Sequence, residues 1–292
     1  MRVWAAIILA AFAFASPVRA EAVVWLMPAY PPAFILDLGE AGSRWRGGGF
    51  AQQMQAWFIK HIPGYESETL EASISRIMTL MQAGDRLYCL ATTNQTQARA
   101  AFMTFSATLY LQPSNRIVVQ TDRSTLLSPY LDTTGAVDLS ALLRDLRIGG
   151  SIASGRAYSA AIDRALAAVP ELDRQSSIET PPKLLLAGRT DWIIAYPREL
   201  EWAWRAGGGD ADAEDRPYRA YPIVGEPPFV ANHIGCTKNA AGQRFIEKID
   251  KTIAANPDRP WRLFMLAWLD RADRAAVEAA EPVASPLNAR PP

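Results

Sequence analysis

The sequence has 292 residues, of which 49% are hydrophobic, and its 30 basic and 30 acidic side chains balance. It is long enough to form two lobes of ordinary size. Its near-neutral charge excludes a general electrostatic attraction to nucleic acid or to an anionic membrane.

Residues 1–20 have the features of a secretory signal peptide. Arg2 precedes a short apolar run, and residues 18–20 fill the positions that a signal peptidase reads. The run falls short of the roughly 20 apolar residues that cross a bilayer, although an uncleaved anchor is the alternative. The residue directly after the predicted cut is Glu21 and not a cysteine, so a lipoprotein form is not expected. We predict cleavage after Ala20, a periplasmic location and a mature net charge of −2, because the leader removes Arg2 and Arg19.

The first part of the mature chain alternates between strand and helix patterns. Pro31 and Pro32 make the loop after the first strand stiff, and Ser73 and Gly84 are typical start and stop residues of the second helix. The predicted elements are strands 22–27, 65–71 and 86–93 and helices 50–62 and 74–84.

The rest of the chain repeats this alternation, and Glu199 and Glu201 are expected on the exposed face of a helix that begins at Pro197. The predicted strands are 148–153, 176–180, 190–196 and 228–235, and the predicted helices are 137–146, 154–169, 181–188, 197–206, 239–255 and 259–280. Residues 207–216 are expected to form a solvated loop, and 281–292 a disordered tail. Alternating strands and helices predict an α/β protein with mainly parallel sheets.

The stretch from Thr92 to Arg99 is the main candidate for a binding site. Thr92 and Thr93 end a predicted strand, and Thr96 is placed to cap a short helix whose first turn holds Arg99. In open α/β sheets, ligands bind outside the carboxyl ends of the strands. A guanidinium there can hold a carboxylate through two parallel hydrogen bonds. A surface ion pair is the alternative role of Arg99.

Cys89 and Cys236 are the two cysteines of the chain. In an oxidising compartment such a pair tends to form a disulfide, which here would close a loop of about 150 residues. Free thiols are the second possibility. A metal site with His61 and His233 is the least favoured, because the four candidate ligands lack a second tightly spaced pair.

Several short motifs together resemble a known family. Thr96-x-x-Arg99 is followed by Phe105-Ser106 and then Tyr110, "AYPPAF" precedes "GGGF", and "SIASGRAY" precedes "LAGRTDWIIAY". In order and spacing they resemble the periplasmic substrate-binding proteins that bind polar amino acids for ABC importers (solute-binding protein family 3). The resemblance covers nearly the whole mature chain. It implies that the chain is a divergent member of this family.

The resemblance implies a two-lobed clamshell of the type 2 periplasmic-binding-protein fold, each lobe a mainly parallel sheet flanked by helices. The chain would cross between lobes near 111–116 and 221–228. Lobe 1 would comprise residues 21–113 with 225–280, and lobe 2 residues 114–224. Cys89 and Cys236 would then lie on neighbouring strands of lobe 1, which supports the disulfide.

The resemblance also implies a ligand site. Arg99 matches the position that binds the ligand carboxylate, and Ser154 to Tyr158 match a turn that opens a helix and can receive an anion at the helix N-terminus. Asp191 matches a structural acid. The predicted ligand-binding residues are Tyr30, Thr92, Asn94, Arg99, Arg156, Ala157, Tyr158 and Tyr196. No cofactor or metal is implied.

One departure from the family bears on the ligand. Five residues after Asp191, where the family has an aspartate for the ligand amino group, this chain has Tyr196, and Arg156 replaces a small hydroxyl residue. A buried ammonium without a carboxylate partner costs several kcal/mol, roughly. An acid with two anionic groups, or an aromatic acid, therefore fits at least as well as an amino acid.

The family resemblance predicts a monomeric, non-enzymatic receptor that presents a small solute to an ABC permease or a membrane sensor. A ligand-free scaffold of the same fold is one alternative. A secreted hydrolase is another: the sequence contains neither G-x-S-x-G nor H-E-x-x-H, but its many Asp and Glu residues leave a paired-carboxylate site open.

Overall fold

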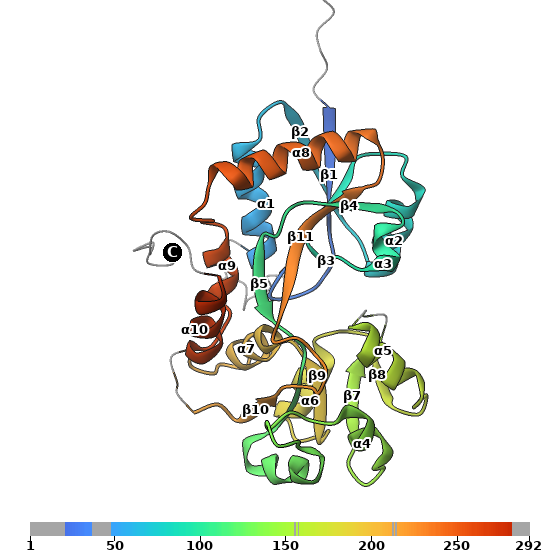
Figure 1. Ribbon diagram of the computed structural model, residues 1–292, viewed down its shortest axis with the longest axis vertical. Coiled ribbons are helices and arrows are strands. Elements are labelled where there is room, and N and C mark those ends of the chain that lie inside the picture. Colours follow the sequence, from blue (N-terminus) through green and yellow to red (C-terminus); the bar gives the residue numbers. More distant parts are fainter. Residues whose placement is uncertain are drawn as a thin grey trace, which may run out of the picture.

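The computed structural model describes residues 21–36, 48–154, 156, 158–211, 213 and 215–281. The predicted signal peptide and residues 282–292 of the predicted tail lie outside this range. The described chain forms two α/β bodies, one above the other in Figure 1, each built around one sheet. Among these residues, no helix combines the length and the apolar character needed to cross a membrane.

The upper sheet has the strand order β2-β1-β3-β11-β4, and β5 also pairs with β11. Its strands are β1 (Glu21–Met27), β2 (Tyr65–Glu71), β3 (Tyr88–Asn94), β4 (Met103–Phe105), β5 (Tyr110–Pro113) and β11 (Phe229–Thr237). The helices of this body are α1 (Phe50–His61), α2 (Ile74–Ala83), α3 (Gln97–Ala100) and α8 (Ala240–Ala255).

Strand β1 is buried on both faces, which is why its sequence is continuously apolar. Val23 and Trp25 belong to the hydrophobic cluster shared with α1 and α8, whereas Val24 and Leu26 belong to the cluster shared with α2. Because successive side chains of a strand point to opposite faces, this one segment supplies the core of two layers.

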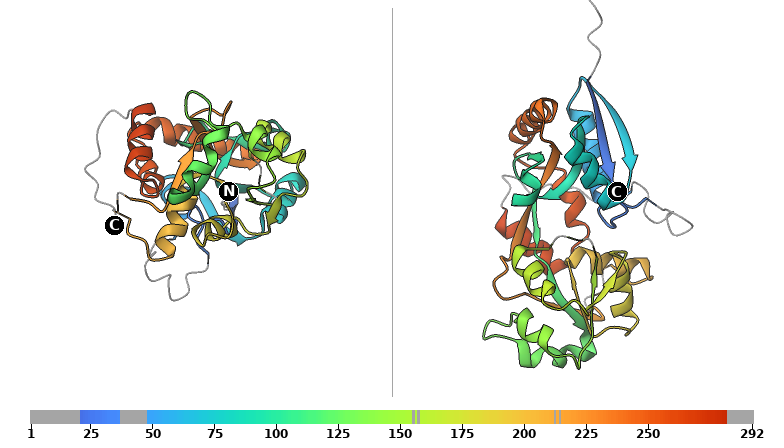
Figure 2. Two further views of the ribbon diagram at one scale, coloured as in Figure 1. Left: turned by 90° about the horizontal axis from the view of Figure 1, so that it is seen from below. Right: turned by 90° about the vertical axis from the view of Figure 1, so that its right-hand side faces the viewer.

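The lower sheet has the order β10-β6-β9-β7-β8. Its strands are β6 (Arg116–Gln120), β7 (Gly150–Ala153), β8 (Asp173–Gln175), β9 (Trp192–Ala195) and β10 (Tyr218–Tyr221). Helices α4 (Leu139–Arg144) and α5 (Ala160–Ala167) contribute to one hydrophobic cluster, and α6 (Thr180–Leu186) and α7 (Pro197–Ala206) to the other. Figure 2 shows the helices around both sheets from two further sides.

The two-lobed α/β class is confirmed, but the sheets are mixed, not mainly parallel. Strand β1 is parallel to β2 and β3, whereas β11 is antiparallel to β3, β4 and β5. The chain passes from β5 to β6 and returns from β10 to β11. These passages join the two sheets, and each antiparallel pair among the described strands involves β6 or β11.

The structure confirms Ser73, Gly84 and Thr96 as helix end signals. The Ser73 hydroxyl accepts a hydrogen bond from the Arg76 backbone N–H, and Gly84 has the left-handed conformation, with φ of 67°. The Thr96 hydroxyl likewise accepts from the Arg99 backbone N–H. Local capping chemistry therefore positions the helix that carries Arg99.

Several sequence predictions differ from the structure, among them the helix expected at 154–169, which is α5 at Ala160–Ala167. The strand expected at 176–180 is β8 at Asp173–Gln175, an exposed edge segment whose polar residues hide the strand pattern. The helix expected at 259–280 is divided into α9 (Arg262–Leu266) and α10 (Arg271–Ala280), with Asp270 capping the second. Glu281, expected in the disordered tail, ends α10 and pairs with Arg262 at 3.2 Å. A 3₁₀ helix over Thr121–Tyr130 was not predicted.

Cys89 and Cys236 form a disulfide that joins β3 to β11, where the two residues are paired neighbours in the sheet. Both side chains are fully buried. The prediction from export and from the family resemblance is confirmed.

The C-terminal helices connect the two bodies along one side, where α10 lies beside α7 in Figure 1. Arg116, the first residue of β6, forms an ion pair with Asp273 of α10. Arg205 of α7 donates a hydrogen bond of 3.0 Å to the Ala267 carbonyl, and Trp202 packs against Trp268. The relative position of the two bodies therefore depends on these helices as well as on the crossing strands.

Candidate functional site

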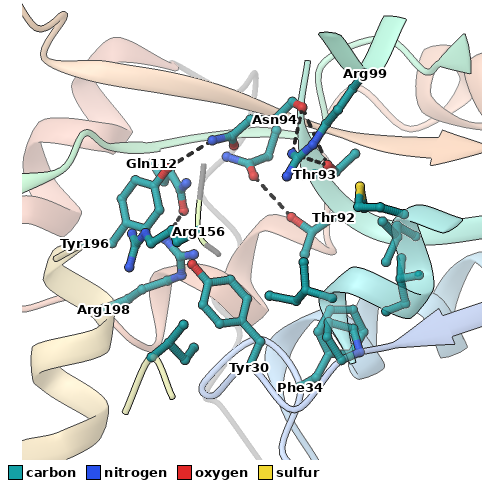
Figure 3. A pocket seen from close by; sticks show the side chains of 17 residues that line it. Tyr30, Phe34, Thr92, Thr93, Asn94, Arg99, Gln112, Arg156, Tyr196 and Arg198 are labelled. Carbon is teal, nitrogen blue, oxygen red and sulfur yellow. Dashed lines mark hydrogen bonds between the residues drawn. The ribbon is translucent and has the colours of Figure 1, made fainter. Parts of the chain in front are cut away.

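A pocket of about 100 Å³ lies between the two sheets, at the carboxyl end of β3. Figure 3 shows it from close by. The upper body contributes the loop after β1, α2, β3, α3, β5 and β11, and the lower body contributes the loop after β7, the segment before α6 and the start of α7. The polar residues that line it are Tyr30, Thr92, Thr93, Asn94, Arg99, Gln112, Arg156, Tyr196, Arg198 and Asn232.

Arg99 lies at one side of this pocket, next to the end of β3 (Figure 3). Its Nη1 donates to the Thr93 hydroxyl at 2.8 Å and to the Asn94 carbonyl at 3.2 Å. These neutral acceptors orient the guanidinium without neutralising it. Within the described chain, Arg99 forms no ion pair.

Glu199 contacts residues that line the pocket, and it is almost fully buried. Its Oε1 accepts from the Tyr30 hydroxyl at 2.8 Å, and its Oε2 accepts from Arg156 Nη1 at 2.7 Å. Oε2 also accepts from the backbone N–H of Tyr196 at 3.1 Å, which caps the start of α7. The prediction that Glu199 is exposed is wrong, because this face of α7 packs toward the upper body.

Glu201 is buried as well, contrary to prediction, in a separate cluster. Its carboxylate pairs with Arg205 at 2.6 Å and with Arg216 at 3.2 Å. Both glutamates of α7 are therefore tied to arginines, one at the pocket and one away from it.

Arg198, in the first turn of α7, brings a third guanidinium to the pocket. Nη1 donates to Gln112 Oε1, and its guanidinium carbon lies 4.3 Å from the centre of the Tyr196 ring. Its closest approach to the Glu199 carboxylate is 3.9 Å. Sequence reasoning missed Gln112, Arg198, Glu199 and Asn232. For Arg198 and Glu199, the available signal was the predicted start of a helix at Pro197.

Besides the contact of Arg198 with Gln112, two hydrogen bonds join the upper and lower bodies directly across this region. Asn94 Nδ2 donates to the Tyr196 hydroxyl at 2.9 Å, and the Tyr30 hydroxyl donates to Glu199. The predicted binding residues are therefore partly bonded to one another, and a solute would have to share or replace these contacts.

The structure brings together most of the predicted site residues. Those that line the pocket are Tyr30, Thr92, Asn94, Arg99, Arg156 and Tyr196. Tyr158 does not line it, although its ring lies 4.8 Å from the Arg156 guanidinium carbon. Ala157 lies outside the described residues.

The helix that opens toward the pocket also differs from the prediction. We expected the start of α5 to face Arg99, but its cap, Ser159, is hydrogen-bonded to Glu226 and does not line the pocket. The start of α7 does so instead, through Tyr196 and Arg198. The loop after β7 contributes Arg156, whose Nη2 donates to Asn115 Oδ1 at 2.7 Å.

Burial and charge set the ionisation of the pocket residues. Burial lowers the pKa of the Arg99 guanidinium below its ordinary value. Burial also lowers the pKa of Arg156, but the Glu199 carboxylate opposes this, and the net pKa is raised well above the ordinary value. Burial raises the pKa of the Tyr30 phenol, so this hydroxyl remains a donor at neutral pH.

Burial raises the pKa of Tyr110 from 10.0 to about 12, although its hydrogen bond to Thr92 opposes the shift. The folded state then holds this proton where the unfolded state has lost it. The stabilisation is complete below pH 10 and is lost as the pH rises to 12, about 3 kcal/mol in all. We expect urea unfolding of Tyr110→Phe to depend less steeply on pH over this interval. Parallel pH profiles for the variant and the unchanged protein would contradict the assignment.

The remaining candidate residues have local roles. Asp191 accepts a hydrogen bond of 2.7 Å from the Gly149 backbone N–H and pairs with Arg123, as a structural acid should. His61 and His233 bond to the carbonyls of Trp57 and Ser106. Among the residues described, no group of three or more His, Cys, Asp or Glu side chains could hold a metal ion.

Neither a protein-family model nor a curated protein matches the sequence. The fold, in contrast, is similar to many solved structures. An amino acid ABC transporter substrate-binding protein from Streptococcus pneumoniae, bound to L-arginine, is 18% identical with a TM-score of 0.60, and the match covers 85% of this chain and 94% of that one. A mutant of ArgBP from T. maritima is 15% identical with a TM-score of 0.59, covering 86% and 95%.

A histidine kinase sensor domain with similarity to periplasmic binding proteins is also among these structures. It is 13% identical with a TM-score of 0.59, and the match covers 91% of this chain and 98% of that domain. Binding proteins of transporters and sensor domains thus share this architecture. The chain has the two-lobed fold of the periplasmic substrate-binding proteins.

Proposed function

We propose that this chain binds a small carboxylate-bearing solute between its two bodies and presents it to a membrane transporter or sensor. The observation that carries the proposal is Arg99, a partly buried cation that lines the pocket and has no ion-pair partner within the described chain. A carboxylate entering the pocket would supply that partner. The similarity in fold to solute-binding proteins supports this role.

The proposal also includes the export, the oligomeric state and the lobe boundaries of the receptor. Residues 1–20 are removed on export, after Ala20, and the mature protein is a monomer in the periplasm. Lobe 1 comprises residues 21–113 with 225–280, and lobe 2 residues 114–224. These boundaries lie close to the passages from β5 to β6 and from β10 to β11.

Replacing Arg99 by glutamine should weaken binding about 100-fold, because two charge-assisted hydrogen bonds to the solute are lost. Mass spectrometry of small molecules released from gently purified protein identifies the solute, and calorimetry with that compound measures the affinity. Arg86→Gln is the matched control, since Arg86 is an exposed cation paired with Glu68. Equal affinities for the two variants would overturn the proposal.

A ligand-free scaffold is the second candidate, and the hydrogen bonds across the pocket favour it. Asn94 and Tyr196 are bonded to each other, as are Tyr30 and Glu199. This candidate predicts that no solute is released from the purified protein and that Arg99→Gln has no effect on solute binding. A paired-carboxylate hydrolase would need two carboxylates facing the pocket, and none is among the described lining residues.

A further inference from the structure

The pocket has an excess of positive charge at both sides. Figure 3 shows Arg99 at one side, and Arg156 and Arg198 at the other. Glu199 is the one carboxylate in contact with these arginines, among the residues that the structure describes. One negative charge therefore faces three guanidinium groups, and the side holding Arg156 and Arg198 keeps an excess of one cation.

Glu199 is already fully engaged by its neighbours. Oε1 accepts from the Tyr30 hydroxyl, and Oε2 accepts from Arg156 and from the Tyr196 backbone N–H. Its ion pair with Arg156 is short, at 2.7 Å, whereas its distance to Arg198 is 3.9 Å. Within the described chain, Glu199 therefore compensates Arg156 and leaves Arg198 with a weaker partner.

Arg198 retains unused hydrogen-bonding capacity. Its guanidinium makes one hydrogen bond to the described residues, to the neutral Gln112, and it stacks on the Tyr196 ring. Its Nε is buried and has no partner among those residues. A buried guanidinium in this state favours an additional anionic acceptor, because buried charges are stable only when paired.

A ligand ammonium group, in contrast, has no acceptor of suitable charge. The position that would carry an aspartate in the resembled family is Tyr196, whose hydroxyl already accepts from Asn94. Glu199 is occupied, and the described pocket lining includes no Asp or Glu. An ammonium placed among three guanidinium groups would be repelled by them.

We infer that the solute is a short dicarboxylate without an amino group, held by Arg99 at one end and by Arg198 at the other. This inference rests on the binding function proposed above and specifies its ligand class. The size of the pocket agrees with it: about 100 Å³ is available, and one water needs roughly 10–15 Å³ of such space. This suits a solute of roughly seven to ten heavy atoms, which covers succinate, glutarate and adipate.

Calorimetry on the unchanged protein, freed of bound solute by unfolding and refolding, provides the first test. Glutarate is compared with its monoamide, which replaces one carboxylate by a neutral group of the same shape, and with glutamate, which adds an ammonium. We expect at least one of succinate, glutarate and adipate to bind, and its monoamide and its 2-amino derivative each to bind about tenfold more weakly or worse.

The second test assigns the second carboxylate to Arg198. Arg198→Gln should reduce the affinity for the dicarboxylate about tenfold and leave that for the monoamide unchanged, whereas Arg198→Lys should restore part of the preference. Circular dichroism confirms that each variant is folded. If Arg198→Gln does not fold, the comparison of ligands on the unchanged protein decides the matter.

The two proposals fail in different ways. If an Arg99-dependent solute is found but no dicarboxylate binds more tightly than its monoamide, or the 2-amino derivative binds as well, the dicarboxylate inference is overturned and the binding function stands. If Arg99 is not needed for the binding of any of these acids or of any released solute, the binding function itself is overturned.

Discussion

Replacing both Cys89 and Cys236 by alanine should lower the free energy of unfolding by about 4 kcal/mol. The disulfide closes a loop between residues 147 positions apart, so its loss greatly increases the freedom of the unfolded chain. It also joins two paired strands of the sheet that carries Thr92. Urea unfolding followed by circular dichroism measures the change.

The control for this variant is the unchanged protein under reducing conditions, which removes the bond without removing the sulfur atoms. Both side chains are fully buried, so the alanine variant loses some packing in addition. Reduction alone should therefore account for most, but not all, of the destabilisation. An unfolding midpoint that does not move on reduction would contradict a stabilising role for the crosslink.

Replacing Glu199 by alanine should destabilise the protein by about 3–5 kcal/mol, because it leaves the buried Arg156 without its carboxylate partner. The change also removes the acceptor for the Tyr30 hydroxyl and for the Tyr196 backbone N–H. Urea unfolding measures the loss of stability, and calorimetry with an identified solute measures the effect on binding.

Glu201→Ala is the matched control, because Glu201 is equally buried, lies on the same helix and pairs with Arg205 and Arg216. It should be destabilising to a comparable extent but leave the affinity for the solute unchanged, since Glu201 lies away from the pocket. If both variants changed the affinity equally, the effect of Glu199 would be a general consequence of lost stability.

Local signals made much of the fold predictable. Strand β1 reads as an uninterrupted apolar run, and α1 shows apolar residues at helical spacing, so both were predicted close to their observed ends. The Thr96 cap placed Arg99 correctly in the short helix α3 that follows β3. These features depend on residues within a few positions of one another, which is the range that sequence patterns report.

The parts that were missed depend on contacts across the chain. Glu199 was predicted to be exposed because it is charged and lies on a helix, but its partners Tyr30 and Arg156 are 169 and 43 positions away. Polar β8 was misplaced for a similar reason, since it is held by pairing with β7 and not by its own apolar residues. Long-range pairing of polar groups leaves no periodic trace in a single sequence.

The ion pair between Arg116 and Asp273 has a consequence for how the two bodies can move. Arg116 begins the strand that enters the lower sheet, and the Asp273 carboxylate is buried in α10, which also packs beside β5 of the upper sheet. Breaking such a pair would leave a buried charge behind and cost several kcal/mol, roughly. A hinge motion that keeps its axis near this contact avoids that penalty. The C-terminal helix α10 would then be part of the pivot of such a motion.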